Sequence, residues 1–358
     1  MQSSDIGQHR LTTHRISQNQ HESVANVVRW QGAMQAQDYK QSLWAIGARL
    51  QSATIDTVEQ ALADAQIVRT WSQRGTIHYV PAEDTLWMLD LCASRILSGH
   101  GRRMKQLNLT EKTMRDCENY LREALADGNA LTRSEVFVLL NQKGEATEKQ
   151  RGYHILWHLA HEGIICMGAM QGKEQTFVLL EDWVTTLRQL SREEALTELV
   201  KRYFKSHSPA TEADFARWSG LTLTDTRKGI AENADWLSSI DIGDETYWFD
   251  ASLEVPSDSD SVYLLAAFDE YLLGYKDRSA VLPDDHANKV VPENNGVFQP
   301  IIVVDGQVVG IWKRKLKKKS VDIICIPFTT FGDAQEAIVA ESEKYATFMG
   351  LALKITFE

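Results

Sequence analysis

Apolar residues in the middle of the chain recur first at helical and then at strand spacing. Thr132 and Glu135 form a capping-box pattern at the start of the second helical run, and Gly163 stands where a left-handed helix end is expected. The pattern predicts helices over 113–126, 132–143 and 149–162, then strands over 164–167 and 176–180. This order of helices followed by a hairpin is typical of a winged helix-turn-helix.

The same order recurs on both sides of this segment, which indicates repetition of one supersecondary unit. In the downstream copy, Thr211 and Asp214 resemble a second capping box, and Thr224 is expected to cap the following helix. The hairpin there turns at Gly243-Asp244. The predicted elements are helices over 192–205, from 211, and 225–233 with strands 237–242 and 245–249 downstream, and helices 22–33, 38–50 and 56–65 with strands 67–72 and 76–80 upstream.

After about residue 251 the pattern changes, because a linker-like segment, 256–260, precedes a strand-rich region. An Asp305-Gly306 turn between β-branched runs predicts a hairpin over 297–315. A further strand, a helix and a final strand predict a small β-barrel-like domain with one packed helix. The predicted fold is therefore α+β, with tandem winged helix-turn-helix units before that domain. The expected domains are 1–112, 113–190, 191–255 and 256–358.

Composition is ordinary for a folded chain of 358 residues, but the formal net charge is -11, from 38 Lys and Arg against 49 Asp and Glu. This balance disfavours a protein that coats phosphate over its whole surface. The four cysteines form no C-x-x-C pair, which argues against a zinc knuckle, an iron–sulfur cluster or a disulfide framework. A polar N-terminus and the lack of a long apolar run lead us to expect a cytoplasmic protein.

The distribution of charge is more informative than its sum. Six cations occupy seven positions over 313–319, and the rest of the chain carries 32 cations against 49 acids, or -17. Seven acids against two cations lie between 257 and 285. A local basic hairpin on an acidic body would concentrate attraction for phosphate. The alternative is an edge strand that lysines protect against pairing.

Two further patterns bear on chemistry. One face of the predicted helix carries three histidines, His154, His158 and His161, and this spacing invites a metal interpretation. We favour contact of this helix with a DNA groove, or packing against Trp157, and we expect no metal site. The sequence also lacks a G-x-S-x-G elbow, a Walker A loop and a G-x-G-x-x-G after a strand. An enzyme of this sequence would rely on a few positioned polar groups, without a cofactor.

Gln35-Ala36-Gln37 lies between two predicted helices. Residues i and i+2 point to different sides of a helix and share a face only in extended backbone. If both glutamines serve one site, the backbone here must be a loop or an extended step. Considered alone, the pair is also compatible with two solvent-exposed loop amides.

Four stretches together carry a family resemblance: 35–37, the string RTWSQRGTIH at 69–78, the string FDEYLLGYKDRS at 268–279, and 296–312. They are similar to the bacterial winged-helix DNA-binding proteins typified by the AlkZ-like DNA glycosylases. The resemblance implies tandem winged helices and a β-barrel arranged around duplex DNA. It also implies hydrolysis of the N-glycosidic bond of alkylated purines, interstrand crosslinks included, by a catalytic Gln-x-Gln motif.

Carried onto this chain, the resemblance makes Gln35 and Gln37 the catalytic residues of a monofunctional, metal-free and cofactor-free DNA glycosylase. Double-stranded DNA with alkylated bases is the expected partner, bound by a monomer. The expected DNA contacts are Lys313, Arg314, Lys315, Lys317 and Arg74. The alternatives are a non-enzymatic DNA-binding protein or regulator, and a protein–protein adaptor.

Acidic residues near these strings have two possible roles. Asp38 is expected either to support the glutamines or to cap the next helix. A direct catalytic role for Asp269 or Glu270 is conceivable, because carboxylates often stabilise oxocarbenium ions. We favour a structural ion-pair network of Asp269, Glu270, Asp277 and Arg278 that holds the barrel against the helices.

Overall fold

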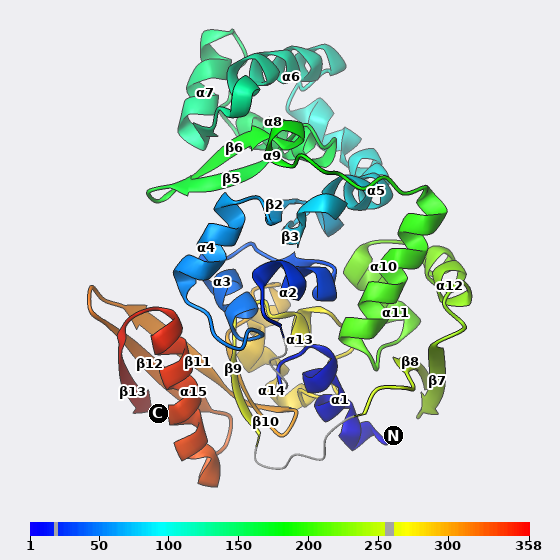
Figure 1. Ribbon diagram of the computed structural model, residues 1–358, viewed down its shortest axis with the longest axis vertical. Coiled ribbons are helices and arrows are strands. Elements are labelled where there is room, and N and C mark those ends of the chain that lie inside the picture. The colour runs from blue at the N-terminus through cyan, green and yellow to red at the C-terminus, as the bar shows by residue number, and fades with distance from the viewer. Residues whose placement is uncertain (18–20, 255–260) are drawn as a thin grey trace. The chain divides into compact units, whose positions relative to one another are not determined.

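The computed structural model describes residues 1–17, 21–254 and 261–358, so the predicted linker at 256–260 lies outside the described residues. The chain divides into two compact units. The first combines Met1–Val58 with Thr197–Glu358, and the second is Glu59–Leu196. Both ends of the chain thus belong to the first unit (Figure 1). In the sequence, the two boundaries between the units fall within helix α4, Ile55–Ala63, and helix α10, Arg192–His207.

The second unit is built around antiparallel strands in the order β3-β2-β5-β6-β4. Its core includes Trp71 and Phe177, whose rings stack with centroids 6.2 Å apart. The bounds of its elements are β2 Ile67–Trp71, β3 Ile77–Pro81, α5 Thr85–Gln106, α6 Glu111–Leu125, β4 Leu131–Thr132, α7 Arg133–Gln142, α8 Arg151–His161, β5 Ile165–Gln171, β6 Glu174–Leu179 and α9 Leu180–Trp183.

The predicted order of helices and strands over 113–180 is present in this unit, since α6, α7 and α8 precede the antiparallel pair β5 and β6. The capping box that was predicted at the start of α7 is confirmed. Thr132 Oγ1 accepts the Glu135 N–H at 3.2 Å, and the Glu135 carboxylate accepts the Thr132 N–H at 2.7 Å. These bonds satisfy backbone donors that the first helical turn would otherwise leave unpaired.

The downstream copy of this order is also present: helices α10, α11 and α12 are followed by the hairpin of β7 and β8. The capping box of Thr211 and Asp214 is confirmed. The cap assigned to Thr224 is wrong, because Thr222 occupies that position and pairs with Asp225 in a third capping box. Thr222 stands three residues before Asp225, which is the spacing that the reciprocal bonds require. The bounds are α11 Glu212–Ser219, α12 Leu223–Ala231, β7 Leu237–Ile242 and β8 Glu245–Asp250.

Five further strands of the first unit form one sheet among the described residues, in the order β13-β12-β11-β10-β9. Helix α15 packs beside this sheet (Figure 1). The sheet is an open half-barrel, with β13 and β9 at its edges and β13 parallel to β12. The predicted Asp305-Gly306 turn is confirmed: Val304 pairs with Gln307, and both turn residues have positive φ. The bounds are β9 Val262–Leu265, β10 Ile301–Val304, β11 Gln307–Leu316, β12 Ser320–Pro327, α15 Gln335–Phe348 and β13 Ala352–Phe357.

Short N-terminal elements complete the first unit, and the glutamine motif lies among them. They are α1 Ile6–Thr13, α2 Val24–Gln31, β1 Met34–Gln35 and α3 Tyr39–Gly47, with α13 Glu270–Leu273 and α14 Asp284–Val290 from the C-terminal part. Within the described residues, no helix combines the length and the apolar character that crossing a membrane requires.

Candidate active site

The glutamine motif lies between two helices, where strand β1 ends at Gln35 and the chain then bends at Gln37. Helix α2 ends at Gly32, whose φ of 79° is a conformation that favours glycine. Helix α3 begins after Asp38, whose Oδ1 accepts the Gln41 N–H at 3.1 Å. Of the two roles expected for Asp38, capping is therefore confirmed. Gly32 therefore ends α2 and Asp38 caps α3, so the backbone between them belongs to neither helix.

The two glutamines differ in exposure. Gln37 is exposed, Gln35 is half-buried, and Ala36 between them is buried. The side-chain oxygen of Gln35, Oε1, is buried and meets no hydrogen-bond donor among the described residues. Leaving a buried acceptor unsatisfied costs about 1–3 kcal/mol. An acceptor of this kind calls for a partner that the described residues do not supply, such as a bound water molecule.

Glu270 holds the backbone of the motif. Its Oε1 accepts the Gln35 N–H at 2.8 Å and its Oε2 accepts the Trp218 indole N–H at 3.1 Å, while the residue is 1% exposed. His207 Nε2 lies 3.7 Å from Oε2. Burial lowers the pKa of His207, although the neighbouring carboxylate opposes that shift. The ring is therefore neutral at pH 7.

The neighbouring carboxylate has a different partner. Asp269 caps α13 by accepting the Tyr271 N–H at 2.9 Å, and its two oxygens accept two N–H groups of Arg49 at 2.7 and 2.9 Å. Both partners of this ion pair are fully buried. Position 274 requires a glycine, because a Cβ there would lie 2.5 Å from the His207 ring. The string at 268–279 thus builds one packed turn that presents Glu270 to Gln35.

The predicted four-residue ion-pair network is wrong in its membership. Arg278 donates to the Leu272 carbonyl at 2.8 Å and lies over the Phe298 ring at 4.9 Å. Asp277 accepts the Ser279 N–H, which is a local turn contact. The cation that binds Asp269 is instead Arg49, which follows the C-cap of α3 and lies more than 200 positions earlier in the chain.

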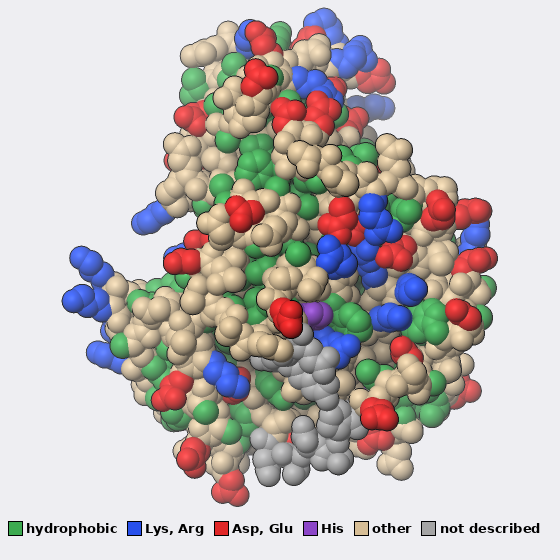
Figure 2. Space-filling view, in the orientation of Figure 1, with side chains coloured by type: hydrophobic (Ala, Val, Ile, Leu, Met, Phe, Trp, Pro, Cys, Tyr) green, Lys and Arg blue, Asp and Glu red, His purple; other side chains and the backbone are tan. Residues whose placement is uncertain are grey.

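The predicted basic hairpin is formed by the last residues of β11 and the turn into β12. Lys313 and Lys315 alternate with Arg314 and are exposed, whereas Arg314 is half-buried and donates to the Tyr345 hydroxyl. Lys317 pairs with Asp322. Figure 2 shows Lys and Arg side chains gathered at this hairpin. Of the four cations predicted here to contact DNA, the three lysines are exposed, and Arg314 and Lys317 have protein partners.

A second cationic feature was missed from the sequence. A pocket of about 390 Å³, which we call the α2–α10 pocket, is lined by Arg29 and Trp30 of α2 and by Lys201 and Lys205 of α10. Figure 2 shows Lys and Arg side chains between these helices. The i, i+4 spacing of Lys201 and Lys205 indicates that they share one helix face, but no feature of the sequence indicates that α2 lies beside α10.

In the second unit, the α8 histidines form a packed cluster. Arg103 Nε donates to His154 Nε2 at 3.3 Å, and His161 Nδ1 lies 2.7 Å from the Trp157 carbonyl oxygen. Burial lowers the pKa of His154 and of His161 to about 4. Across the described residues, no group of three or more His, Cys, Asp and Glu side chains is placed to hold a metal ion.

Arg74, the remaining predicted DNA contact, also belongs to the second unit. It has a positive φ of 54° in the turn between β2 and β3, and its Nη2 lies 3.5 Å from His78 Nε2. Both residues come from the family-like string at 69–78, which forms this hairpin.

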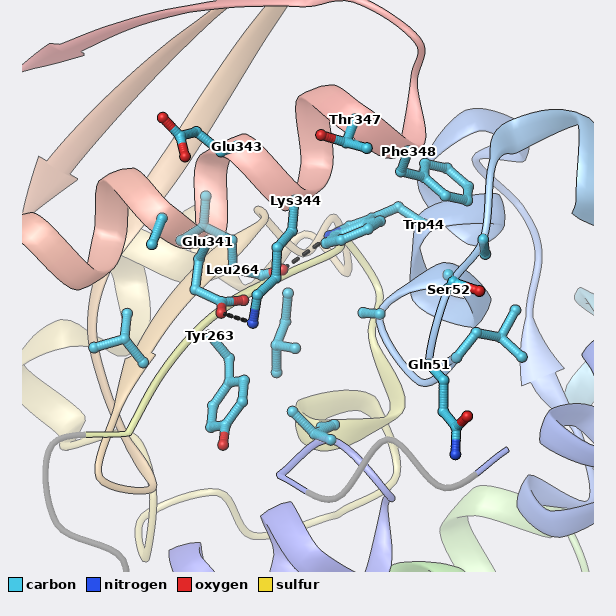
Figure 3. Close-up of a pocket in the computed structure, with 18 of the residues that line it drawn as sticks. Trp44, Gln51, Ser52, Tyr263, Leu264, Glu341, Glu343, Lys344, Thr347 and Phe348 are labelled. Carbon is cyan, nitrogen blue, oxygen red and sulfur yellow. Dashed lines mark hydrogen bonds and ion pairs between the residues drawn. The ribbon is translucent and has the colours of Figure 1, made fainter. Parts of the chain in front are cut away.

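The first unit also has a cavity of about 880 Å³ that does not involve the glutamines. Figure 3 shows it between α3, β9 and α15. The Trp44 indole N–H donates to the Leu264 carbonyl at 2.8 Å on one side, and Glu341 pairs with Lys344 on the other. Neither Gln35 nor Gln37 lines this cavity, so we do not assign it to the reaction.

Comparison with known proteins agrees with the resemblance. A family model described as DNA glycosylase AlkZ-like matches residues 28–348. A curated protein of Streptomyces sahachiroi, named interstrand DNA cross-link repair glycosylase, is 26% identical over 349 residues, which cover 92% of this chain and 91% of that protein. The solved structure of the Streptomyces sahachiroi DNA glycosylase AlkZ matches with a TM-score of 0.82 at 23% identity, over 99% of this chain and 100% of that one. Since the family model spans most of the chain, the protein belongs to the AlkZ-like DNA glycosylases and is itself an enzyme of that kind.

Proposed function

We propose that this glycosylase hydrolyses the N-glycosidic bond of N7-alkylated purines in duplex DNA, including purines joined in interstrand crosslinks. The relative from Streptomyces sahachiroi bears the name of a crosslink repair enzyme, which supports the second substrate class. Alkylation at N7 gives the purine a positive charge, so the base departs readily and the sugar acquires oxocarbenium character. Unmodified purines are poor leaving groups and should be spared.

A departing cationic base needs a positioned water more than it needs a strong general base. We assign that positioning to Gln35 and Gln37, whose amide carbonyls can accept the hydrogen atoms of one water at the anomeric carbon. Their dipoles also stabilise the developing cation without moving during the reaction. The observation that carries this proposal is the buried Oε1 of Gln35, which meets no donor among the described residues.

DNA binding in this proposal uses tandem winged helix-turn-helix units at 1–112, 113–190 and 191–255, with the C-terminal domain at 256–358. Phosphates would be contacted by the basic hairpin, by Arg74 and by the cations of the α2–α10 pocket. We propose a monomer that requires no metal or cofactor.

The test is release of free base from a duplex that carries one N7-methylguanine. Purified protein should release N7-methylguanine and leave an abasic site whose strand stays intact until alkali is added. An unmodified duplex of the same sequence is the control. Binding to the damaged duplex without release of base would contradict the proposed reaction and favour a non-enzymatic DNA-binding role.

A further inference from the structure

We propose that Glu270 is a positioning residue for the reaction: it fixes Gln35 through the backbone, and its negative charge favours the cationic transition state. This inference rests on the proposed function, because it needs a reaction in which the sugar becomes positively charged. Asp269 and Glu270 are adjacent in sequence and equally buried, yet the structure gives them different tasks.

The geometric part concerns the backbone of Gln35. Gln35 is held in place by Glu270 Oε1, which accepts its backbone N–H at 2.8 Å. Glu270 is itself held by the Trp218 indole and by the cap that Asp269 makes for α13. A hydrogen bond to a buried carboxylate is stronger than one to a neutral acceptor. Loss of this bond would let the backbone at Gln35 shift and misplace its side chain by a fraction of an ångström.

The electrostatic part concerns the sign of the charge. Each oxygen of Glu270 accepts an N–H group, and hydrogen bonds of this kind favour the ionised form of a carboxyl group. The nearby His207 is neutral at pH 7 because burial lowers its pKa. In a water-poor site, a fixed negative charge near the motif stabilises a positive sugar more than a neutral one. This differential effect is what accelerates a reaction.

Asp214 offers a matched control in the same compact unit. It is also 1% exposed, and its carboxylate accepts backbone N–H groups of Thr211 at 2.9 Å and Lys276 at 2.7 Å. Its replacement by asparagine removes a buried carboxylate of comparable burial and bonding. Asp214 makes no contact with Gln35 among the contacts that the structure describes, so Asp214→Asn reports the cost of losing such a group elsewhere in the unit.

The experiment compares wild type, Glu270→Gln and Asp214→Asn in the full-length protein. Two quantities are measured with each folded variant. One is the single-turnover rate of N7-methylguanine release at saturating protein. The other is the ratio of affinities for duplexes that contain a cationic pyrrolidine abasic analogue or a neutral tetrahydrofuran. We expect Glu270→Gln to lower the rate by about 10-fold to 100-fold and to reduce the preference for the cationic duplex. Affinity for undamaged DNA should stay within about twofold of wild type.

Asp214→Asn should lower the melting temperature by an amount similar to that of Glu270→Gln but leave the rate and the preference unchanged. Equal losses of rate in the two variants would overturn the inference, and so would a wild-type rate and preference in Glu270→Gln. If wild type releases no base, the proposed function fails and this inference fails with it. If wild type releases base and Glu270→Gln keeps both the rate and the preference, the inference alone is rejected and the proposed function stands.

Discussion

The glutamine motif and the basic hairpin are both polar regions of the first compact unit, but they are built in opposite ways. At the motif, Gln37 is exposed, but the backbone N–H of Gln35 is held by the buried carboxylate of Glu270, more than 200 positions away. At the hairpin, Lys313 and Lys315 are exposed on consecutive outward positions of one strand. One region depends on exact positions, and the other depends on the sum of its charges.

This difference determines what a substitution should do in each region. Removal of a buried polar partner leaves its neighbour unsatisfied and costs the full desolvation of that group. Removal of an exposed lysine removes one screened interaction with phosphate and little else. The buried region should therefore respond in stability and in the rate of chemistry. The hairpin should respond in salt-dependent affinity.

The largest effect is expected at Arg49, the buried partner of Asp269. Arg49→Met leaves that carboxylate without its guanidinium and should lower the free energy of unfolding by about 3–5 kcal/mol, measured by urea denaturation. The control is Lys112→Met, which removes a cation that is 79% exposed and should cost no more than about 1 kcal/mol. Similar costs for the two variants would erase the contrast between buried and exposed pairs.

The next effect is expected at the hairpin. Lys313→Gln with Lys315→Gln should weaken binding to duplex DNA and flatten the plot of log affinity against log salt. The slope should fall by about 0.9 for each phosphate contact that is lost. Adding Arg314→Gln should weaken binding further, but it also breaks the contact with Tyr345, so its melting temperature should fall as well. The same change in affinity at every salt concentration would contradict a role in phosphate binding.

The smallest effect is expected from the histidine cluster of α8. His154 and His161 have pKa values of about 4 when folded, against about 6.5 when unfolded. The unfolded chain therefore binds more protons between these values, and stability should fall as pH drops from about 6.5 toward 4. His154→Gln should reduce this dependence in melting curves while leaving the slope above pH 7 unchanged. An unaltered profile would show that His154 is not the titrating group.

Local signals predicted the elements of the fold well. The capping boxes at Thr132 and Thr211 and the Asp305-Gly306 turn depend on residues that are close in sequence, so they could be identified directly. The 22-residue helix α5 was not predicted. Its N-terminal half is buried and its C-terminal half carries a run of cations, so no continuous apolar stripe of helical spacing runs along it. The open half-barrel depends on which strands end at an edge, and local pattern does not encode that.

The candidate site was predictable only in part. The sequence singled out Gln35 and Gln37 and required a loop or an extended step there, and the structure places them between α2 and α3, outside either helix. It did not reveal that Glu270 binds the Gln35 backbone or that Arg49 binds Asp269. These contacts join residues 235 and 220 positions apart and arise from packing, so a single sequence carries no local trace of them.

The central claim is that the glutamine motif performs the chemistry and the cationic surfaces only bind. The most direct test is the single-turnover rate of N7-methylguanine release by Gln37→Ala, measured beside its affinity for the same duplex. We expect a rate that is lower by about 100-fold or more, with affinity within about twofold of wild type, because Gln37 is exposed and its loss should not disturb the fold. Release at the wild-type rate, or a loss of rate fully explained by weaker binding, would contradict it.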